Sequence, residues 1–251
     1  MRVEVLTLFP ELVEQVTKVG IPRIAVEQGA LQLQARQLRD YSGNRWNRVD
    51  ERPFGGGPGM VMQPEPLAQA VMAAKQACGA NAPVLLMSPQ GERFDQQWAR
   101  RLAQEPAWIV VCGRYEGVDE RFLASEVTAE LSFGDFVLSG GELAAMAMVD
   151  AVTRLLPGVL GDAESAVTDS FSAGHLDHPH YTRPVHWRGK PVPEVLLSGD
   201  HRAIREWRLA QALGQTWLKR PDLLAGLELK AVHHMLLREY LSGYASQWLD
   251  K

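Results

Sequence analysis

Three short, mostly apolar stretches, each followed by a glycine-bearing turn, are the feature that most constrains the fold. Residues 83–88 (PVLLMS) and 107–112 (AWIVVC) have the length and composition of buried strands, and residues 130–133 (ELSF) predict a third strand. Helical patterns lie between and after these stretches. Strands that alternate with helices predict an α/β fold with a mainly parallel sheet that is covered on both faces.

The rest of the first two thirds of the chain fits the same pattern. Residues 2–8 and 31–35 alternate apolar and polar side chains as strands do, and residues 40–62 show no regular pattern. We expect one helix to begin at Pro10, and the other helices to cover residues 22–29, 64–77, 94–104, 119–125 and 142–156.

The three turns after the central strands are candidates for a ligand site. They are residues 88–91 (SPQG), 113–117 (GRYEG) and 134–141 (GDFVLSGG). In open α/β sheets, ligands bind beyond the carboxyl ends of the strands, and glycine lets a ligand approach the backbone closely. The turns therefore predict one small-molecule pocket, with plain tight turns as the alternative.

The common nucleotide-binding patterns are missing from the sequence. There is no GxxxxGK[ST] segment, and residues 8–11 (LFPE) stand after the first strand where a dinucleotide site would have GxGxxG. The absence of GxGxxG also argues against the usual glycine-rich methyltransferase layout. A cofactor without a polyphosphate suits the three turns better.

A glycine-rich segment, residues 52–59 (RPFGGGPG), follows a stretch rich in arginine and aromatic residues. Ordering three consecutive glycines costs much conformational entropy. A loop of this kind therefore indicates a functional role. Basic and aromatic side chains together favour a nucleic acid, whereas a solvated basic loop is the alternative. The side chains concerned are Arg36, Arg39, Tyr41, Arg45, Trp46, Arg48 and Arg52.

The last third of the chain differs in charge from the rest. Residues 176–251 hold 11 Lys and Arg against 8 Asp and Glu, whereas residues 1–175 hold 15 against 22, and all seven histidines lie at or after position 175. Helices are predicted over residues 201–217 and 228–241, the first with Trp217 on its apolar face. A basic, helical region can meet an anionic partner, although the excess is small. Arginines recur every three residues on another side of the first helix, and they either bind RNA or form a solvated face: Arg202, Arg205 and Arg208.

Residues 175–180 (HLDHPH) raise the question of a metal. A structural zinc ion needs four ligands in a tetrahedron, no cysteine is near, and Pro179 stiffens the run. Contacts to an anionic polymer or local structure are therefore the preferred interpretations, and a metallohydrolase is a minor one. The two cysteines, Cys78 and Cys112, lack metal or redox spacing, and no apolar run suits a signal peptide or a membrane span, so we expect a cytoplasmic protein.

Six segments in this order closely resemble one family, from the first strand to the last helix. They are RPFGGGPGM (52–60), SPQG (88–91), GRYEGVDER (113–121), GDFVLSGGE (134–142), DAVTRLLPG (150–158) and HPHYTRP (178–184). The family they resemble is the bacterial tRNA (guanine-N1)-methyltransferases of the SPOUT class. The chain departs from the pattern at three positions: Phe136 replaces a common Tyr, Ala144 a common Pro and Met87 a common Leu.

The resemblance implies an organisation and partners that composition does not show. It implies a trefoil-knotted α/β domain that binds S-adenosylmethionine in residues 1–160, a flexible linker in 161–175, and a small helical tRNA-binding domain in 176–251. The implied enzyme is a homodimer with active sites at the subunit interface. It methylates N1 of guanine 37, beside the anticodon, in tRNAs with a preceding G, and magnesium is associated with the reaction.

The resemblance also implies the site residues. Asp169, from the neighbouring subunit, would be the general base, and Arg154 its partner at the guanine. The implied cofactor-binding residues are Ser88, Pro89, Gly113, Tyr115, Glu116, Gly117, Phe133, Gly134, Asp135, Phe136, Val137, Leu138, Gly140 and Gly141. The metal ligands are left unassigned. Two other readings remain open: a SPOUT methyltransferase acting on ribosomal RNA, and an RNA-binding module without catalysis.

Overall fold

The computed structural model of the chain describes residues 1–161 and 168–249. The chain divides into two compact units, Met1–Ala163 and Glu164–Lys251, and each unit is described by itself. Of the predicted linker, residues 162–167 lie outside the described residues.

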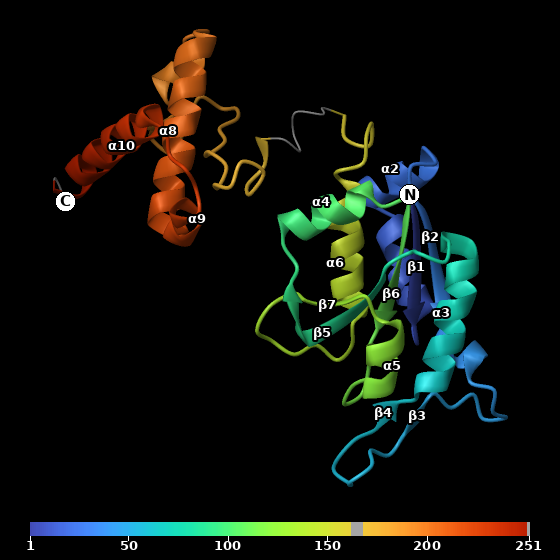
Figure 1. The fold of residues 1–251 in the computed structure, drawn as a ribbon. Coiled ribbons are helices and arrows are strands. Elements are labelled where there is room, and N and C mark those ends of the chain that lie inside the picture. Colours follow the sequence, from blue (N-terminus) through green and yellow to red (C-terminus); the bar gives the residue numbers. More distant parts are fainter. Residues whose placement is uncertain (162–167, 250–251) are drawn as a thin grey trace. The chain divides into compact units, whose positions relative to one another are not determined.

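The first unit is built on a five-stranded sheet in the order β2-β1-β6-β5-β7 (Figure 1). All neighbouring strands are parallel, which confirms the predicted α/β class and all five predicted strands. The strands are β1 (Arg2–Thr7), β2 (Gln32–Gln37), β5 (Val84–Arg93), β6 (Ala107–Cys112) and β7 (Ala129–Ser132). The central strand β6 is buried along its whole length, which explains its uninterrupted apolar sequence.

Helices cover both faces of this sheet, and each face has its own core (Figure 1). Trp108 and Val110 of β6 point into one core, and Ile109 and Val111 point into the other, as strand alternation requires. The first core is closed by α1 (Pro10–Glu14), α2 (Gly20–Glu27), α4 (Gln96–Gln104) and α6 (Glu142–Thr153). The second is closed by α3 (Pro64–Cys78) and α5 (Glu120–Glu126).

The segment between β2 and α3, predicted to be irregular, contains only short elements. These are the 3₁₀ turn η2 (Leu38–Tyr41) and the two-residue strands β3 (Asp50–Glu51) and β4 (Val61–Met62), which pair antiparallel; a further 3₁₀ turn, η1 (Gln15–Thr17), follows α1. Between β3 and β4 the glycine-rich loop has positive φ at Gly55, Gly56, Gly57 and Gly59. Four such angles explain the glycines, because other residues rarely adopt them.

The second unit is mainly helical. Its core consists of Leu213, Leu224, Leu236 and Leu237. Its elements are β8 (His186–Trp187), β9 (Lys190–Pro191), η3 (Glu194–Leu197), α8 (His201–Lys219), α9 (Pro221–Ala225) and α10 (Ala231–Leu249). Within α8, a Cβ at Gly214 would lie 2.1 Å from the Tyr240 ring, so this glycine permits the close crossing with α10.

Two predictions for these helices need correction. Trp217, expected on the apolar face of α8, is 49% exposed, and Leu213 and Thr216 are buried instead. The face is set by where α10 packs, which the sequence of α8 alone does not reveal. The last helix also continues beyond the predicted end at residue 241, to Leu249. Among the described residues, no helix has both the length and the apolar character needed to cross a membrane.

Candidate cofactor-binding site

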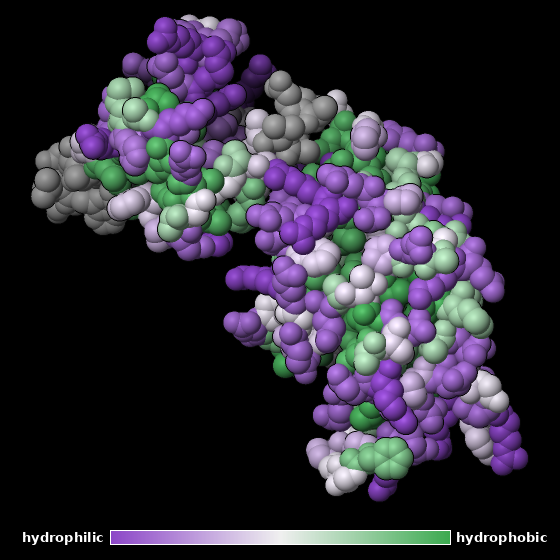
Figure 2. All heavy atoms as spheres, in the orientation of Figure 1, coloured by the Kyte–Doolittle hydropathy of each residue, from purple (hydrophilic) through white to green (hydrophobic). Residues whose placement is uncertain are grey.

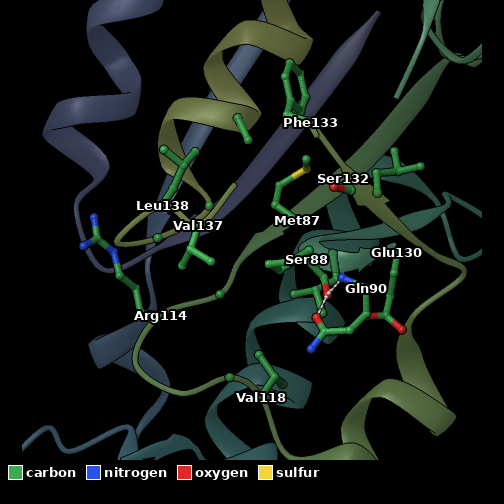
Figure 3. Close-up of a pocket in the computed structure, with 18 of the residues that line it drawn as sticks. Met87, Ser88, Gln90, Arg114, Val118, Glu130, Ser132, Phe133, Val137 and Leu138 are labelled. Carbon is green, nitrogen blue, oxygen red and sulfur yellow. Dashed lines mark hydrogen bonds between the residues drawn. The ribbon is translucent and has the colours of Figure 1, made fainter. Parts of the chain in front are cut away.

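A cavity of about 580 Å³ lies beyond the carboxyl ends of β5, β6 and β7 in the first unit (Figure 3). All three predicted turns line it: the second and third follow β6 and β7, and the first lies within β5. Its wall combines backbone groups of the glycine turns with apolar side chains such as Met87, Phe133 and Val137. A pocket of this kind suits a small ligand with one apolar part and several hydrogen-bonding atoms.

The first turn, residues 88–91, is a bulge within β5. Met87 and Glu92 both pair with Leu131 of β7, so the residues between them are pushed out of the ladder. A Cβ on Gly91 would lie 2.4 Å from the backbone of Glu130, so only glycine fits here. The Ser88 hydroxyl donates to the Gln90 side chain at 2.6 Å, and both lie at the cavity (Figure 3).

The second turn is tied to the end of the glycine-rich segment. The Glu116 N–H donates to the Met60 carbonyl, and the Met62 N–H donates to the Gly117 carbonyl, both at 2.9 Å. A Cβ at Gly59 would meet the Glu116 side chain at 2.3 Å. The glycine-rich segment therefore supports one wall of the cavity. This structural role explains part of its glycine content, and it does not require that the segment bind RNA.

The third turn approaches the second so closely that side chains are excluded. The Gly141 N–H donates to the Gly113 carbonyl at 3.0 Å, and a Cβ on Gly141 would lie 2.9 Å from Cα of Cys112. A Cβ on Gly140 would lie 2.1 Å from the Arg114 side chain. The thiol of Cys112 is fully buried beneath this contact, and burial raises its pKa well above the ordinary thiol value.

A buried ion pair joins these two turns below the cavity. Glu142, at the start of α6, is 1% exposed and accepts hydrogen bonds from Arg114 Nε at 3.0 Å and from the Thr7 hydroxyl at 2.8 Å. Arg114 also donates to the Ser139 carbonyl and lies over the Phe9 ring, 4.5 Å from its centroid. A charge buried this deeply is tolerated because it is paired and hydrogen-bonded.

Almost the whole predicted cofactor set lines this cavity. The exception is Asp135, which is exposed on the third turn and is not among the lining residues. The positions that depart from the family pattern, Met87, Phe136 and Ala144, also line it. Lining residues outside the three turns that the sequence did not single out are Leu86, Val118, Glu120, Leu123, Glu130, Leu131 and Ser132. Most of these residues flank the predicted turns. Their position next to the strand ends is therefore the sequence feature that could have identified them.

The predicted catalytic pair lies in two different units. Arg154 is the C-terminal cap of α6 in the first unit and is half-buried. Asp169 is half-buried in the second unit, where its carbonyl accepts the Ser172 N–H at 3.1 Å. The structure therefore describes each of the two residues only in the surroundings of its own unit.

The arginine-rich stretch before the glycine loop is not one uniform surface. Arg36 donates to the fully buried Glu4, which Arg2 also contacts at 2.6 Å. The Glu4 hydrogen bond, the largest cause, raises the pKa of Arg36. Arg36 is thus part of the sheet's own ion pairs. Trp46, in contrast, is 69% exposed, with the Arg45 guanidinium stacked 4.3 Å from its ring centroid.

The fold and the cavity define a class: a parallel α/β protein that holds a small ligand beyond the carboxyl ends of its central strands. A model of the family tRNA (guanine-1)-methyltransferase TrmD matches residues 1–226. A tRNA (guanine-N(1)-)-methyltransferase of Halorhodospira halophila is 54% identical over 98% of this chain and 93% of its own length. The enzyme of that name from Methylococcus capsulatus is 57% identical over 90% of each chain. The chain belongs to the TrmD family.

Proposed function

We propose that the protein transfers a methyl group from S-adenosylmethionine to N1 of guanine 37 in tRNAs with a G at position 36. The observation that carries the proposal is the family membership over nearly the whole chain, joined to a cavity lined by the three glycine turns. The family's relatives are named for methylation of guanine N1 in tRNA. Position 37 and the methyl donor follow from the resemblance.

The cavity fits S-adenosylmethionine in size and chemistry. Backbone N–H and C=O groups of the turns can hydrogen-bond an adenine and an amino-acid group, and apolar side chains can cover the adenine faces. The cofactor supplies an electrophilic methyl group on a positively charged sulfur. Ser88, Gly113, Tyr115, Leu138 and Gly141 are the residues that we assign to hold it, with the other predicted turn residues.

Two residues carry the proton chemistry in this proposal. Neutral guanine holds a proton on N1, so a base has to remove it before N1 is a good nucleophile. We assign this role to the Asp169 carboxylate, which has to lie within hydrogen-bond reach of N1. A free aspartate, with a pKa of about 3.9, is a weak base, so the charge that develops on O6 needs stabilisation. We assign that role to the Arg154 guanidinium, which is always positive.

The proposal includes a dimer, a knot and an RNA-binding second unit. Exposed apolar side chains at and near the cavity support a subunit interface there: Phe136 is 56% exposed, Val137 85% and Leu143 56%. Figure 2 shows hydrophobic surface among hydrophilic side chains over the α6 region of the first unit. Asp169 would reach the guanine from the partner subunit of an isologous dimer. The knot and the cytoplasmic location follow from the resemblance and the composition.

The side-chain donor atoms of the described residues give little support for a magnesium site. In the described parts of the chain, the one cluster of three side chains able to hold an ion contains two histidines and one aspartate. Magnesium prefers an octahedral shell of oxygen atoms, so this cluster does not fit it. We therefore assign no step of the reaction to magnesium.

Methyl transfer to an unmodified tRNA transcript tests the proposal. The assay uses labelled S-adenosylmethionine and two transcripts, one with G at positions 36 and 37 and a matched copy with A at 37. Label in the G37 transcript alone is the expected result. Label in neither transcript, from a folded protein that binds the cofactor, would contradict the tRNA assignment and favour ribosomal RNA as the target. A protein that binds RNA but takes up no cofactor would be a binding module instead.

A further inference from the structure

We propose that Asp177, His178 and His180 in the second unit form a binding site for a divalent transition-metal ion. The three side chains offer one ligand atom each, and these atoms lie within 4.8 Å of one another. The proposed site belongs to the second unit and shares no residue with the cofactor cavity, and its binding test does not require the proposed methyl transfer.

The geometry of the aspartate and the second histidine is close to that of two ligands on one ion. Nε2 of His180 lies 2.9 Å from Oδ2 of Asp177. Two atoms that are each about 2.1 Å from an ion, at roughly right angles, stand about 3 Å apart. The other carboxylate oxygen, Oδ1, is held by the His178 backbone N–H at 2.7 Å, which fixes the carboxylate plane.

The first histidine presents its remaining nitrogen to the same place. Nδ1 of His178 lies 3.2 Å from the Pro179 carbonyl, a partner that can only accept a hydrogen bond. This contact assigns the proton to Nδ1 and leaves the lone pair on Nε2, which lies 3.8 Å from Oδ1 of Asp177. A backbone carbonyl on the non-ligating nitrogen is the usual support of a metal-bound histidine.

The donor set selects the kind of ion. Two imidazoles and one carboxylate suit Zn²⁺, Ni²⁺, Co²⁺ or Fe²⁺ and do not suit Mg²⁺ or Ca²⁺. Three protein ligands leave coordination positions for water or another oxygen donor. The His180 side chain is 71% exposed, so an ion can enter from solvent, whereas Asp177 and His178 are more sheltered, at 22% and 16%.

The site lies on the segment that carries Asp169. The Asp177 N–H donates to the Ser170 hydroxyl at 2.9 Å, and the Leu176 N–H donates to the Thr216 hydroxyl of α8 at 2.9 Å. An ion held by residues 177–180 therefore fixes the chain next to the predicted base. We infer that metal binding slows amide hydrogen exchange in residues 168–184.

Calorimetric titration of tag-free, chelator-treated full-length protein with Zn²⁺ tests the site, without RNA or S-adenosylmethionine. We expect one ion per chain, and visible absorption bands when Co²⁺ is the probe. His178→Ala and His180→Ala should each weaken binding by more than the roughly 10–100-fold that loss of an outer-shell partner costs. His186→Ala, an exposed histidine of β8, should leave it unchanged.

The outcomes separate clearly. No saturable Zn²⁺ binding by the wild type would overturn the proposal, as would equal binding by the double variant of His178 and His180, which would point to other histidines. Because the His180 ring is exposed, His180→Ala should fold even if a variant at Asp177 does not. Neither of these two negative outcomes would contradict the proposed methyl transfer, because that activity is measured separately, by the incorporation of label into tRNA.

Discussion

The cofactor cavity of the first unit and residues 168–184 of the second unit are built in opposite ways. The cavity turns are tied to one another by backbone hydrogen bonds, and glycines allow contacts that a Cβ would block. No residue of 168–184 is buried, and few backbone hydrogen bonds hold the segment. Regions with few buried contacts open at lower free energy. The contrast indicates that the cavity is preformed, whereas Asp169, the proposed base, lies on a loosely held segment.

Asp169→Ala tests this contrast with the largest expected effect. If the first unit alone holds the cofactor, the variant should bind S-adenosylmethionine as the wild type does and lose turnover by roughly 10²–10⁴-fold, the usual contribution of a general base. Calorimetry and single-turnover methyl transfer measure the two properties. Thr168→Ala, a neighbour of the proposed base, is the control and should keep most of the turnover. Near-normal turnover in Asp169→Ala would rule out the base assignment.

Glu142→Gln tests whether the ion pair below the cavity holds the two turns together. The substitution removes the charge that faces Arg114 at 2.9 Å in a nearly water-free place. We expect the free energy of unfolding to fall by about 1.5–3 kcal/mol, the range for hydrogen bonds to charged groups, and cofactor binding to weaken.

The matched control is Glu126→Gln, which breaks a half-exposed pair with Lys75 that is 3.0 Å long. An exposed pair contributes only about 0–1 kcal/mol, so this variant should remain close to the wild type in urea unfolding. If the free energy of unfolding fell equally in both variants, the burial of Glu142 would add nothing to the strength of its ion pair.

Gly141→Ala tests the tight contact between the second and third turns. The added methyl group would lie 2.9 Å from Cα of Cys112 and from Cβ of Met87, and neither atom can move without shifting a strand. We expect a loss of about 1–3 kcal/mol in stability, as for overpacking elsewhere, together with weaker cofactor binding. Gly161→Ala meets nothing within 4 Å and serves as the control in the same unit. If Gly141→Ala changed neither stability nor cofactor binding, the contact of the third turn with Cys112 and Met87 would be easily deformed.

The sequence predicted those parts of the molecule that depend on local pattern. The five strands follow from apolar runs and alternation, and the cavity follows from glycine turns placed after three of them. The turns are recognisable because their glycines are required by close backbone approach at Gly91 and Gly141. Local chemistry was therefore enough to locate the cavity and most of its lining.

Pairings between distant residues could not be predicted in this way. Arg36 was grouped with possible RNA contacts, yet it pairs with Glu4, 32 residues away. The Thr7–Glu142 hydrogen bond spans 135 residues. A metal site was set aside because no cysteine is near and Pro179 stiffens the run. The convergence of Asp177, His178 and His180 on one point depends on the backbone path. Such partners become visible only when the chain is folded.

The smallest expected effect concerns the two thiols. Burial raises the pKa of both, by more for Cys112, which lies under the cavity, than for the half-exposed Cys78. A thiol whose pKa is raised by folding keeps its contribution to stability below the unfolded value of about 8.5, and loses it as the pH rises toward the folded value. The free energy of unfolding should therefore decline above about pH 8.5, by at most about 1.4 kcal/mol per pH unit for one thiol.

Urea unfolding between neutral and alkaline pH measures this decline, and Cys112→Ala should flatten it, although that variant is less stable at every pH because of its cavity. A thiol reagent gives the complementary measurement: Cys78 should react in the folded protein, and Cys112 only after unfolding. If Cys112 reacted as fast as Cys78 under native conditions, the part of the first unit beneath the cavity would open readily. The cavity would then not be rigid even at the fully buried Cys112, and the contrast between a preformed cavity and a loosely held segment around the proposed base would not hold.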